Sequence, residues 1–215
     1  MALVVSKKYN YIFFHLPKNA GVSISNTLIN EEYQLILKKF SLYLLRHLKG
    51  KNNNYHFSLR NKNFFFFNSH ITCYDFCKKI SKEEFKNSIK FAVIRNPWDR
   101  MVSRYFYSKK VSNFFENFSF EEFINYDIKN NLKVLNQFEF CTSDKSNFCL
   151  DRVIRFENIN NDFTKIYKHI FDKSIILKSM NSTIHEDYKK YYDIKLKDKI
   201  YKNFKKDINY FKYEF

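Results

Sequence analysis

The chain has 215 residues, with 38 lysines and arginines against 22 aspartates and glutamates, and therefore a formal net charge of +16. Hydrophobic residues make up 45% and aromatic residues 20%, which excludes disorder as the main state and suits one domain over residues 1–215. The charge favours an anionic partner: nucleic acid, an anionic membrane surface, or a phosphorylated or sulfated small molecule.

Hydropathy and cysteine spacing predict where the protein resides. The sequence has no run of about eighteen uncharged apolar residues that would predict a transmembrane helix. Lys7 and Lys8 follow a short apolar start and leave no room for a secretory signal. The four cysteines lack the close spacing of a zinc site, so we expect reduced thiols, no metal and a cytoplasmic location. The positive charge leaves open a peripheral contact with an anionic membrane.

Apolar runs alternate with amphipathic segments along the chain. The expected strands are residues 11–15, 64–67, 89–94, 151–156 and 174–177. Helices are expected from Ser23 to Lys49 (or with a break near Lys38), from Ser81 after a capping box, from a cap at Asp99, over 114–140, from Asn158 to Ile170, and before Tyr213. Residues 51–63 are polar and predict a surface loop. The alternation predicts an α/β fold with a central, mainly parallel sheet flanked by helices.

Two short segments, residues 15–23 and 95–103, hold both prolines, one of the two glycines and the only tryptophan. Each follows a predicted strand and opens a predicted helix, at the sheet edge where ligands bind in parallel α/β folds. In the first segment, Gly21 and small neighbours let the backbone approach a ligand, and the amides of the helix N-terminus suit an anion. Lys18 adds a positive charge and Ser23 a hydroxyl. The segment does not have the Walker A spacing, which argues against an ATPase or kinase.

The second segment begins with Arg95 at the end of a strand and reaches Ser103 two helical turns later. A guanidinium and a hydroxyl can together hold a second phosphate. The alternative is that Arg95 pairs with a carboxylate and Ser103 has no role. Two such turns in one α/β chain favour a nucleotide with two separated anionic groups.

These segments resemble the sulfotransferases that use 3′-phosphoadenosine 5′-phosphosulfate (PAPS), in the branch of the carbohydrate sulfotransferases and their bacterial relatives. The first segment is similar to the family pattern H-[IL]-P-K-[TN]-A-G-[TV]-S and the second to R-[ND]-P-[YWF]-[DE]-R-[LM]-V-S-x-[YF]. Residues 155–159 are similar to R-[FY]-E-[ND]-[LI], and residues 181–188 and 207–215 resemble the family's C-terminal part. Asn19 and Val22 stand where hydroxyl residues are common, so the loop amides remain as the donors.

The resemblance implies a single-domain, P-loop-like fold and transfer of a sulfonyl group from PAPS to a hydroxyl acceptor, with no metal. The branch that the motifs resemble implies a carbohydrate or glycan as this acceptor. It places Lys18 at the leaving group. Arg95 and Ser103 would hold the 3′ phosphate. The implied donor-binding residues are Lys18, Asn19, Ala20, Gly21, Val22, Ser23, Arg95 and Ser103.

A general base for the acceptor hydroxyl has two candidates. His70 follows the strand at 64–67, which places it at the same sheet edge as Lys18, and a histidine suits proton abstraction near neutral pH. His185 is the rival, in a role that faces the acceptor or supports the fold. Asn181 and Ser182 are weaker candidates for donor or acceptor contacts.

Two other function classes stay open at this point. A basic nucleic-acid-binding module fits the charge and the aromatic content, although the sequence matches no RRM, zinc-finger or basic-zipper pattern. A nucleotide kinase-like P-loop protein fits the strand-to-helix turns, although its glycine spacing is missing. We expect no nucleic acid as partner.

Overall fold

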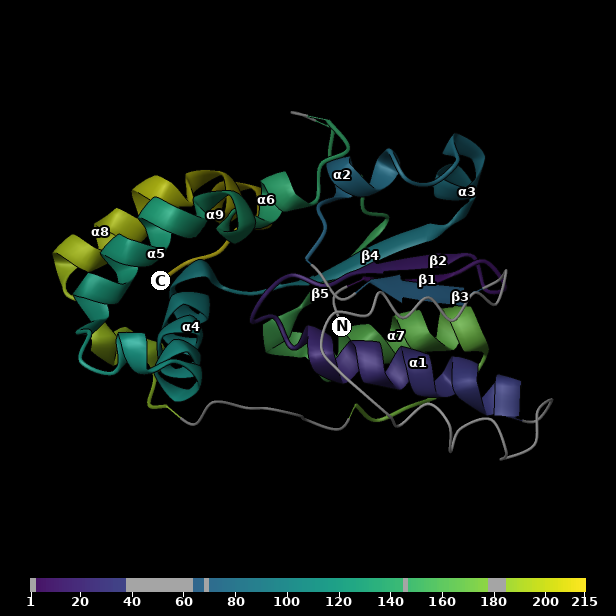
Figure 1. The fold of residues 1–215 in the computed structure, drawn as a ribbon, viewed down its shortest axis with the longest axis horizontal. Helices are drawn as coiled ribbons and strands as arrows, with labels where there is room; N and C mark the ends of the chain where they lie inside the picture. Colours follow the sequence, from purple (N-terminus) through teal and green to yellow (C-terminus); the bar gives the residue numbers. More distant parts are fainter. Residues whose placement is uncertain (1–2, 38–63, 68–69, 145–146, 178–184) are drawn as a thin grey trace.

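The computed structural model describes residues 3–37, 64–67, 70–144, 147–177 and 185–215. A five-stranded sheet in the order β3-β1-β2-β4-β5 forms its centre (Figure 1). The strands are β1 (Leu3–Ser6), β2 (Tyr11–Phe14), β3 (Phe64–Phe67), β4 (Ile89–Ile94) and β5 (Arg152–Arg155). β1 runs antiparallel to both of its neighbours, while β2, β4 and β5 are mutually parallel. The predicted mainly parallel sheet is therefore confirmed, with β1 as the one reversed strand of the five.

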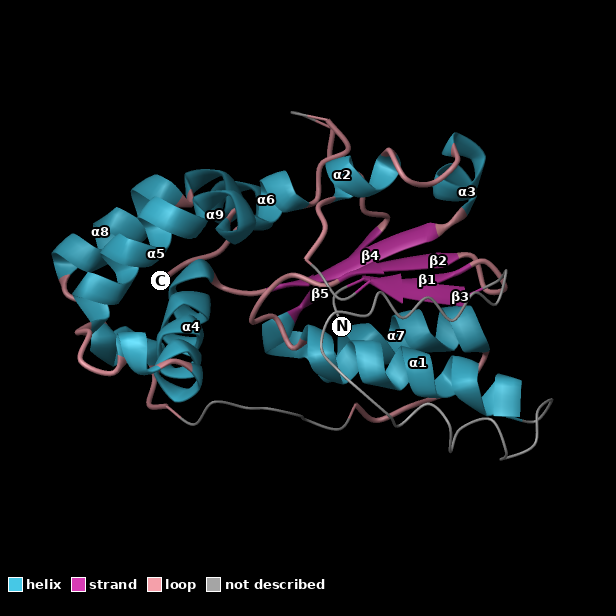
Figure 2. Ribbon diagram, viewed as in Figure 1, coloured by secondary structure: helices cyan, strands magenta, loops and turns pink. Residues whose placement is uncertain are grey.

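Helices cover both faces of this sheet and one of its ends (Figure 2). The described α-helices are α1 (Gly21–Leu37), α2 (Cys73–Cys77), α3 (Lys82–Asn87), α4 (Pro97–Val111), α5 (Phe120–Leu135), α6 (Gln137–Phe140), α7 (Ile159–Phe171), α8 (Ile194–Asn203) and α9 (Lys205–Phe211). α1 and α7 pack on one face and α2 on the other, whereas α4, α5, α8 and α9 form a helical layer at one end of the sheet. Each of the three packings has its own cluster of buried aromatic and aliphatic side chains.

Two strand predictions differ from the structure. β1 was not predicted, because its four residues form only a short apolar start to the chain, yet all four are buried between β2 and β3. The strand predicted at 174–177 is wrong. The Ile175 carbonyl instead accepts a hydrogen bond from the Thr164 hydroxyl at 2.8 Å, and Leu177 packs into the core. An apolar run can thus be buried by its side chains without joining the sheet.

The helix starts correct two further predictions. Asn96, not Asp99, caps α4: its side chain accepts from the Trp98 amide, and Pro97 occupies the first turn. The predicted start at Ser81 is confirmed, with its hydroxyl accepting from the Glu84 amide. The first long helix begins at Gly21 rather than Ser23. Its predicted continuation beyond residue 37, and the predicted loop at 51–63, lie outside the described residues.

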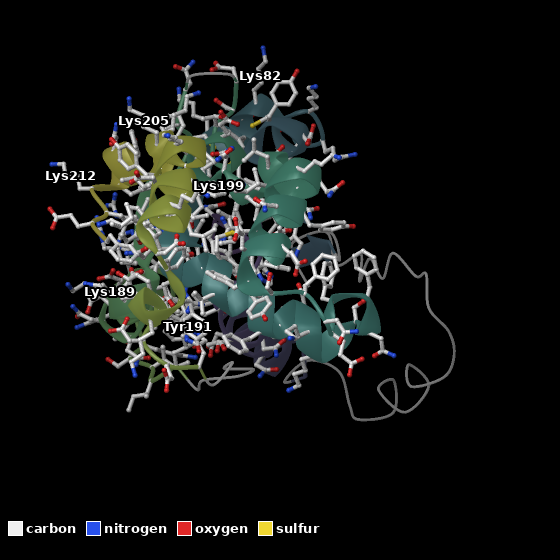
Figure 3. All side chains as sticks on the ribbon, turned by 90° about the vertical axis from the view of Figure 1, so that its left-hand side faces the viewer. Lys82, Lys189, Tyr191, Lys199, Lys205 and Lys212 are labelled. Atoms are coloured by element: carbon white, nitrogen blue, oxygen red, sulfur yellow. The ribbon has the colours of Figure 1, made fainter. Side chains whose placement is uncertain are left out.

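Many lysines lie on the outside of the helical layer. Figure 3 shows Lys189, Lys205 and Lys212 pointing away from it, and all three are exposed. None of the helices in the described ranges is long and apolar enough to cross a bilayer.

Glu32 of α1 is a carboxyl group buried against the sheet, with 3% of its surface exposed. One of its oxygens, Oε1, has no hydrogen-bond partner among the described residues. Burial raises the pKa of Glu32, although the neighbouring hydroxyls of Ser6 and Tyr11 act in the opposite direction. The folded state therefore favours the protonated carboxyl group.

Because this folded-state pKa is raised, the stabilisation from Glu32 is present at acidic pH and is lost as pH rises through the folded-state value. We expect Glu32→Gln to raise the free energy of unfolding at neutral pH by about 1 kcal/mol or more, measured by urea unfolding between pH 4 and 8. Glu84→Gln is the control, and it should lower the free energy of unfolding at neutral pH. The pKa of Glu84 is lowered by its bond to Lys7, so its charged form stabilises the folded state. If the free energy of unfolding depends on pH in the same way in the wild type and in Glu32→Gln, the pKa of Glu32 is not raised in the folded state.

Candidate active site

The two motif segments lie side by side because β2 and β4 are adjacent parallel strands. Both strands end at the same sheet edge, where the loop after β2 leads into α1 and the turn after β4 leads into α4. The Arg95 guanidinium donates to the Lys18 carbonyl at 3.2 Å and joins the two segments directly. The structure thus brings together the two turns that the sequence analysis singled out.

The loop after β2 has an unusual backbone. Lys18 and Ala20 both have positive φ, at 65° and 54°, a conformation that non-glycine residues adopt at a cost. The Ala20 carbonyl accepts from the Ser23 amide at 3.1 Å, so that amide already has a partner within the helix start. The amides of Gly21 and Val22 lie in the first turn of α1, where the helix itself provides no acceptors. Those two amides suit an anion better than the Ser23 amide.

Gly21 is required by packing and not by its own backbone angles. Its φ is not positive. A Cβ built on Gly21 would lie 1.9 Å from Cδ2 and 2.4 Å from Cγ of the His15 ring. The space above this glycine is therefore filled by His15, which is itself 6% exposed, and not held for a ligand as the small residues suggested.

We expect Gly21→Ala to displace the His15 ring, which has little room to move. Overpacking of this kind costs about 1–3 kcal/mol, and the free energy of unfolding from thermal or urea denaturation measures it. Ala20→Gly is the matched control one residue away. It relieves a positive φ and leaves stability within about 1 kcal/mol of the wild type. Wild-type stability in Gly21→Ala would show that the ring moves freely.

Lys18 is half-buried among cations. Its ammonium lies 4.0 Å from the centroid of the Tyr107 ring. Burial, followed by the charges of Arg95, Arg104 and Lys110, lowers the pKa of Lys18 to about 8. Among the described residues, the charged groups that shift this pKa are all cations, although Arg95 is paired with Asp99 and Arg104 with Asp127. An anionic ligand would favour the charged form of Lys18.

Asn19 faces the protein and not the loop opening. Its side-chain Nδ2 donates to the Val93 carbonyl at 2.7 Å and to Gln137 Oε1 at 2.8 Å. Both hydrogens of the amide group are used, so the side chain has no donor left for a phosphate. The side chain therefore anchors the loop to the end of β4 and to α6.

Arg95 forms the ion pair that the sequence analysis kept as its alternative. Its Nε donates to Asp99 Oδ2 at 2.7 Å and its Nη2 to Asp99 Oδ1 at 2.9 Å. The guanidinium also stacks 3.9 Å from the centroid of the Phe156 ring. A guanidinium has five N–H donors. The two bonds to Asp99 and the bond to the Lys18 carbonyl use three of them, so two remain for another acceptor. Ser103, further along α4, is buried with 2% exposure.

Arg100 and Glu157 form hydrogen bonds that join the two turns to neighbouring segments. Neither residue was predicted to have a role. The Arg100 Nε donates to the Pro17 carbonyl at 3.0 Å, which ties α4 to the first loop. Glu157 accepts from the Asn96 amide at 2.7 Å and from the Tyr213 hydroxyl at 3.1 Å. Both residues belong to the family-like patterns, which was the signal available in the sequence.

His70 lies beside the first loop. Its Nδ1 is 2.8 Å from the His15 carbonyl oxygen, and the two imidazole rings meet edge to face with centroids 5.0 Å apart. A carbonyl oxygen only accepts, so Nδ1 carries the proton and Nε2 keeps a lone pair. His70 is exposed, and the dehydration of its ring where it packs against His15 lowers its pKa, against the effect of that hydrogen bond. The neutral ring is a base at neutral pH.

His185 is held elsewhere, before the short 3-10 helix η4 (Tyr188–Tyr191). Its ring stacks on Phe106 of α4, with centroids 5.8 Å apart, and Nδ1 lies 2.8 Å from the Glu186 carbonyl oxygen. Asn181 and Ser182, the weaker candidates, lie outside the described residues.

Comparison with known proteins agrees with this arrangement. The model of the sulfotransferase family matches residues 1–214. The chain belongs to the sulfotransferase family. An uncharacterized protein of Archaeoglobus fulgidus is 30% identical to this sulfotransferase over 118 residues, which cover 52% of this chain and 92% of the archaeal protein. No solved structure matches the chain significantly.

Family membership indicates a transferase that moves a sulfonyl group. Across the described residues, no three His, Cys, Asp or Glu side chains are grouped so that they could hold a metal ion. A cavity of about 350 Å³ lies at the amino ends of β4 and β5, away from the two turns. It is lined by Ile89, Arg152, Val153, Asp162, Lys165, Ile166 and His169. This cavity is at the wrong edge of the sheet to serve the residues described above.

Proposed function

We propose that this sulfotransferase uses PAPS as its donor and a sugar hydroxyl as its acceptor. The observation that carries the proposal is the half-buried Lys18, surrounded by cations and placed at the junction of two strand-to-helix turns. PAPS has two separated anionic groups, on the 5′ and 3′ positions, and two adjacent turns with unused donors suit such a ligand.

The first turn suits the 5′ end of the donor. The amides of Gly21 and Val22 open α1, and Lys18 adds a positively charged group whose pKa is lowered by burial and by neighbouring cations. In the second turn, Arg95 keeps two donors for the 3′ phosphate even though Asp99 holds its other edge. Ser103 is buried, so its hydroxyl joins this site only if the bound phosphate reaches below the α4 surface.

When bound, PAPS supplies the sulfonyl group and its 5′ phosphate as the leaving group. Lys18 provides positive charge where negative charge develops at that phosphate, an effect that acts strongly in a partly dehydrated site. His70 Nε2 accepts the proton of the acceptor hydroxyl, while the Nδ1–H bond to the His15 carbonyl holds the ring in the required tautomer.

The acceptor class is supported by the carbohydrate branch that the motifs resemble and by an aromatic side chain at the site. Tyr107 is 44% exposed and lies directly against the Lys18 ammonium. Aromatic rings offer an apolar face with a polar edge, which suits a saccharide. The chain's charge of +16 further favours an acceptor that already carries anionic groups.

Ligand-dependent thermal unfolding tests this proposal. A ligand of the folded state raises the unfolding temperature, so adenosine 3′,5′-bisphosphate is expected to stabilise the chain more than adenosine 5′-monophosphate or ATP. Preferential stabilisation by ATP would favour a kinase-like protein, and stabilisation by duplex DNA alone would favour a nucleic-acid-binding module. Transfer of labelled sulfate from PAPS to a panel of sugars then identifies the acceptor.

A further inference from the structure

Gln137 connects the two turns of the site although it lies far from both in the sequence. It is the first residue of α6 and is fully buried. Its Oε1 accepts from the Arg95 amide at 2.9 Å and from Asn19 Nδ2 at 2.8 Å, and its Nε2 donates to the Arg95 carbonyl at 2.9 Å. One carboxamide thus binds the backbone of the second turn on both sides and the side chain that anchors the first.

Gln137 is itself held from the C-terminal layer. The Asp207 carboxylate of α9 accepts from the Gln137 amide and from the Phe138 amide, each at 2.8 Å. Asp207 is fully buried, and its burial raises its pKa, whereas these two amides and Arg100 favour the charged form. Since a buried carboxylate with two short hydrogen bonds has little freedom, the start of α6 is fixed in place.

We propose that Gln137 is a positioning residue that sets the spacing between the two phosphate sites. The inference rests on the proposed function, because it requires that each turn binds one phosphate of the same nucleotide. A ligand that bridges two subsites gains from both only when their separation matches its own. A rigid carboxamide between the turns provides that match without touching the ligand, so its loss should weaken a bisphosphate far more than a monophosphate.

The test is Gln137→Met, which keeps the length of the side chain and removes all three hydrogen bonds. Calorimetry gives dissociation constants for adenosine 3′,5′-bisphosphate and adenosine 5′-monophosphate with each chain. We expect the variant to lose about tenfold or more in affinity for the bisphosphate and to change its affinity for the monophosphate by less than about threefold. The ratio of the two losses is a measure that a general loss of stability does not change.

Thr142→Val is the matched control. Thr142 is buried in the segment that follows α6, and its hydroxyl donates to the Glu139 carbonyl at 2.8 Å, without joining the turns. It should lower stability and leave the ratio of affinities unchanged. If Gln137→Met does not fold, Gln137→Glu, which keeps the acceptor and loses the Nε2 donor, provides the same comparison.

The outcomes separate this inference from the function on which it rests. Equal losses for both nucleotides in the variant, with a wild type that prefers the bisphosphate, would overturn the positioning role alone. A wild type that binds both nucleotides equally would overturn the proposed donor and this inference with it. A selective loss for the bisphosphate supports both.

Discussion

Lys18→Met is expected to reduce kcat by about a hundredfold or more, the usual cost of removing one electrostatic contact to a developing charge. The folded state should be at least as stable as the wild type at pH 7. The pKa of Lys18 is lowered to about 8 by burial and by neighbouring cations, so the protein holds a charged group that its surroundings disfavour. Steady-state turnover and thermal unfolding of the same sample separate the two effects.

The lowered pKa also predicts how donor binding depends on pH. In the free enzyme the ammonium is lost as pH rises through about 8, so kcat/KM for the donor should fall above that pH. A bound phosphate favours the charged lysine, so binding of adenosine 3′,5′-bisphosphate near pH 8 should take up protons. Calorimetry in buffers of different ionisation enthalpy measures this uptake, which Lys18→Met should abolish.

Lys110→Met is the control for this prediction. Lys110 is an exposed lysine whose charge acts on Lys18 without the contact to Tyr107. Its removal should change kcat by less than about threefold, as expected for a screened surface charge. Equal losses in the two variants would show that total charge matters, and not the position of the Lys18 ammonium.

His70→Ala is expected to reduce kcat by about a hundred- to ten-thousandfold, the usual contribution of a general base. It should also remove the acidic limb of the pH–rate profile. Dehydration of the ring where it packs against His15 lowers the pKa of His70, so in the wild type this limb should lie below the ordinary imidazole range. Binding of adenosine 3′,5′-bisphosphate should change little, because the imidazole acts on the acceptor.

His185→Ala is the matched histidine control. Its ring stacks on Phe106 and is held by the Glu186 carbonyl, so its removal should chiefly raise the KM for the acceptor. If the two variants exchange behaviours, His185 is the base and the tautomer argument for His70 does not describe catalysis.

Much of the framework followed from local patterns in the sequence. Strands were predicted at 11–15, 64–67, 89–94 and 151–156 because short apolar runs between turn residues have few other stable arrangements, and the structure has strands at 11–14, 64–67, 89–94 and 152–155. Prolines and a glycine are so rare in this chain that their positions marked the two turns at one sheet edge. The same patterns missed β1 and placed a strand at 174–177, since an apolar run near a chain end or beside a helix is buried equally well with or without pairing.

The contacts that shape the site were decided only by the tertiary structure. The Arg95–Asp99 pair, the His15 ring over Gly21 and the Gln137 carboxamide between the turns involve polar groups whose partners are chosen by packing. Gln137 lies 118 residues from Asn19 and 42 from Arg95 along the chain. The residues around a glutamine in a helical segment do not indicate whether its side chain is exposed or forms hydrogen bonds to two distant loops. The sequence determined which residues meet at the carboxyl edge of the parallel strands. The fold decided which of their hydrogen-bond donors remain free, because buried polar groups are paired with one another first.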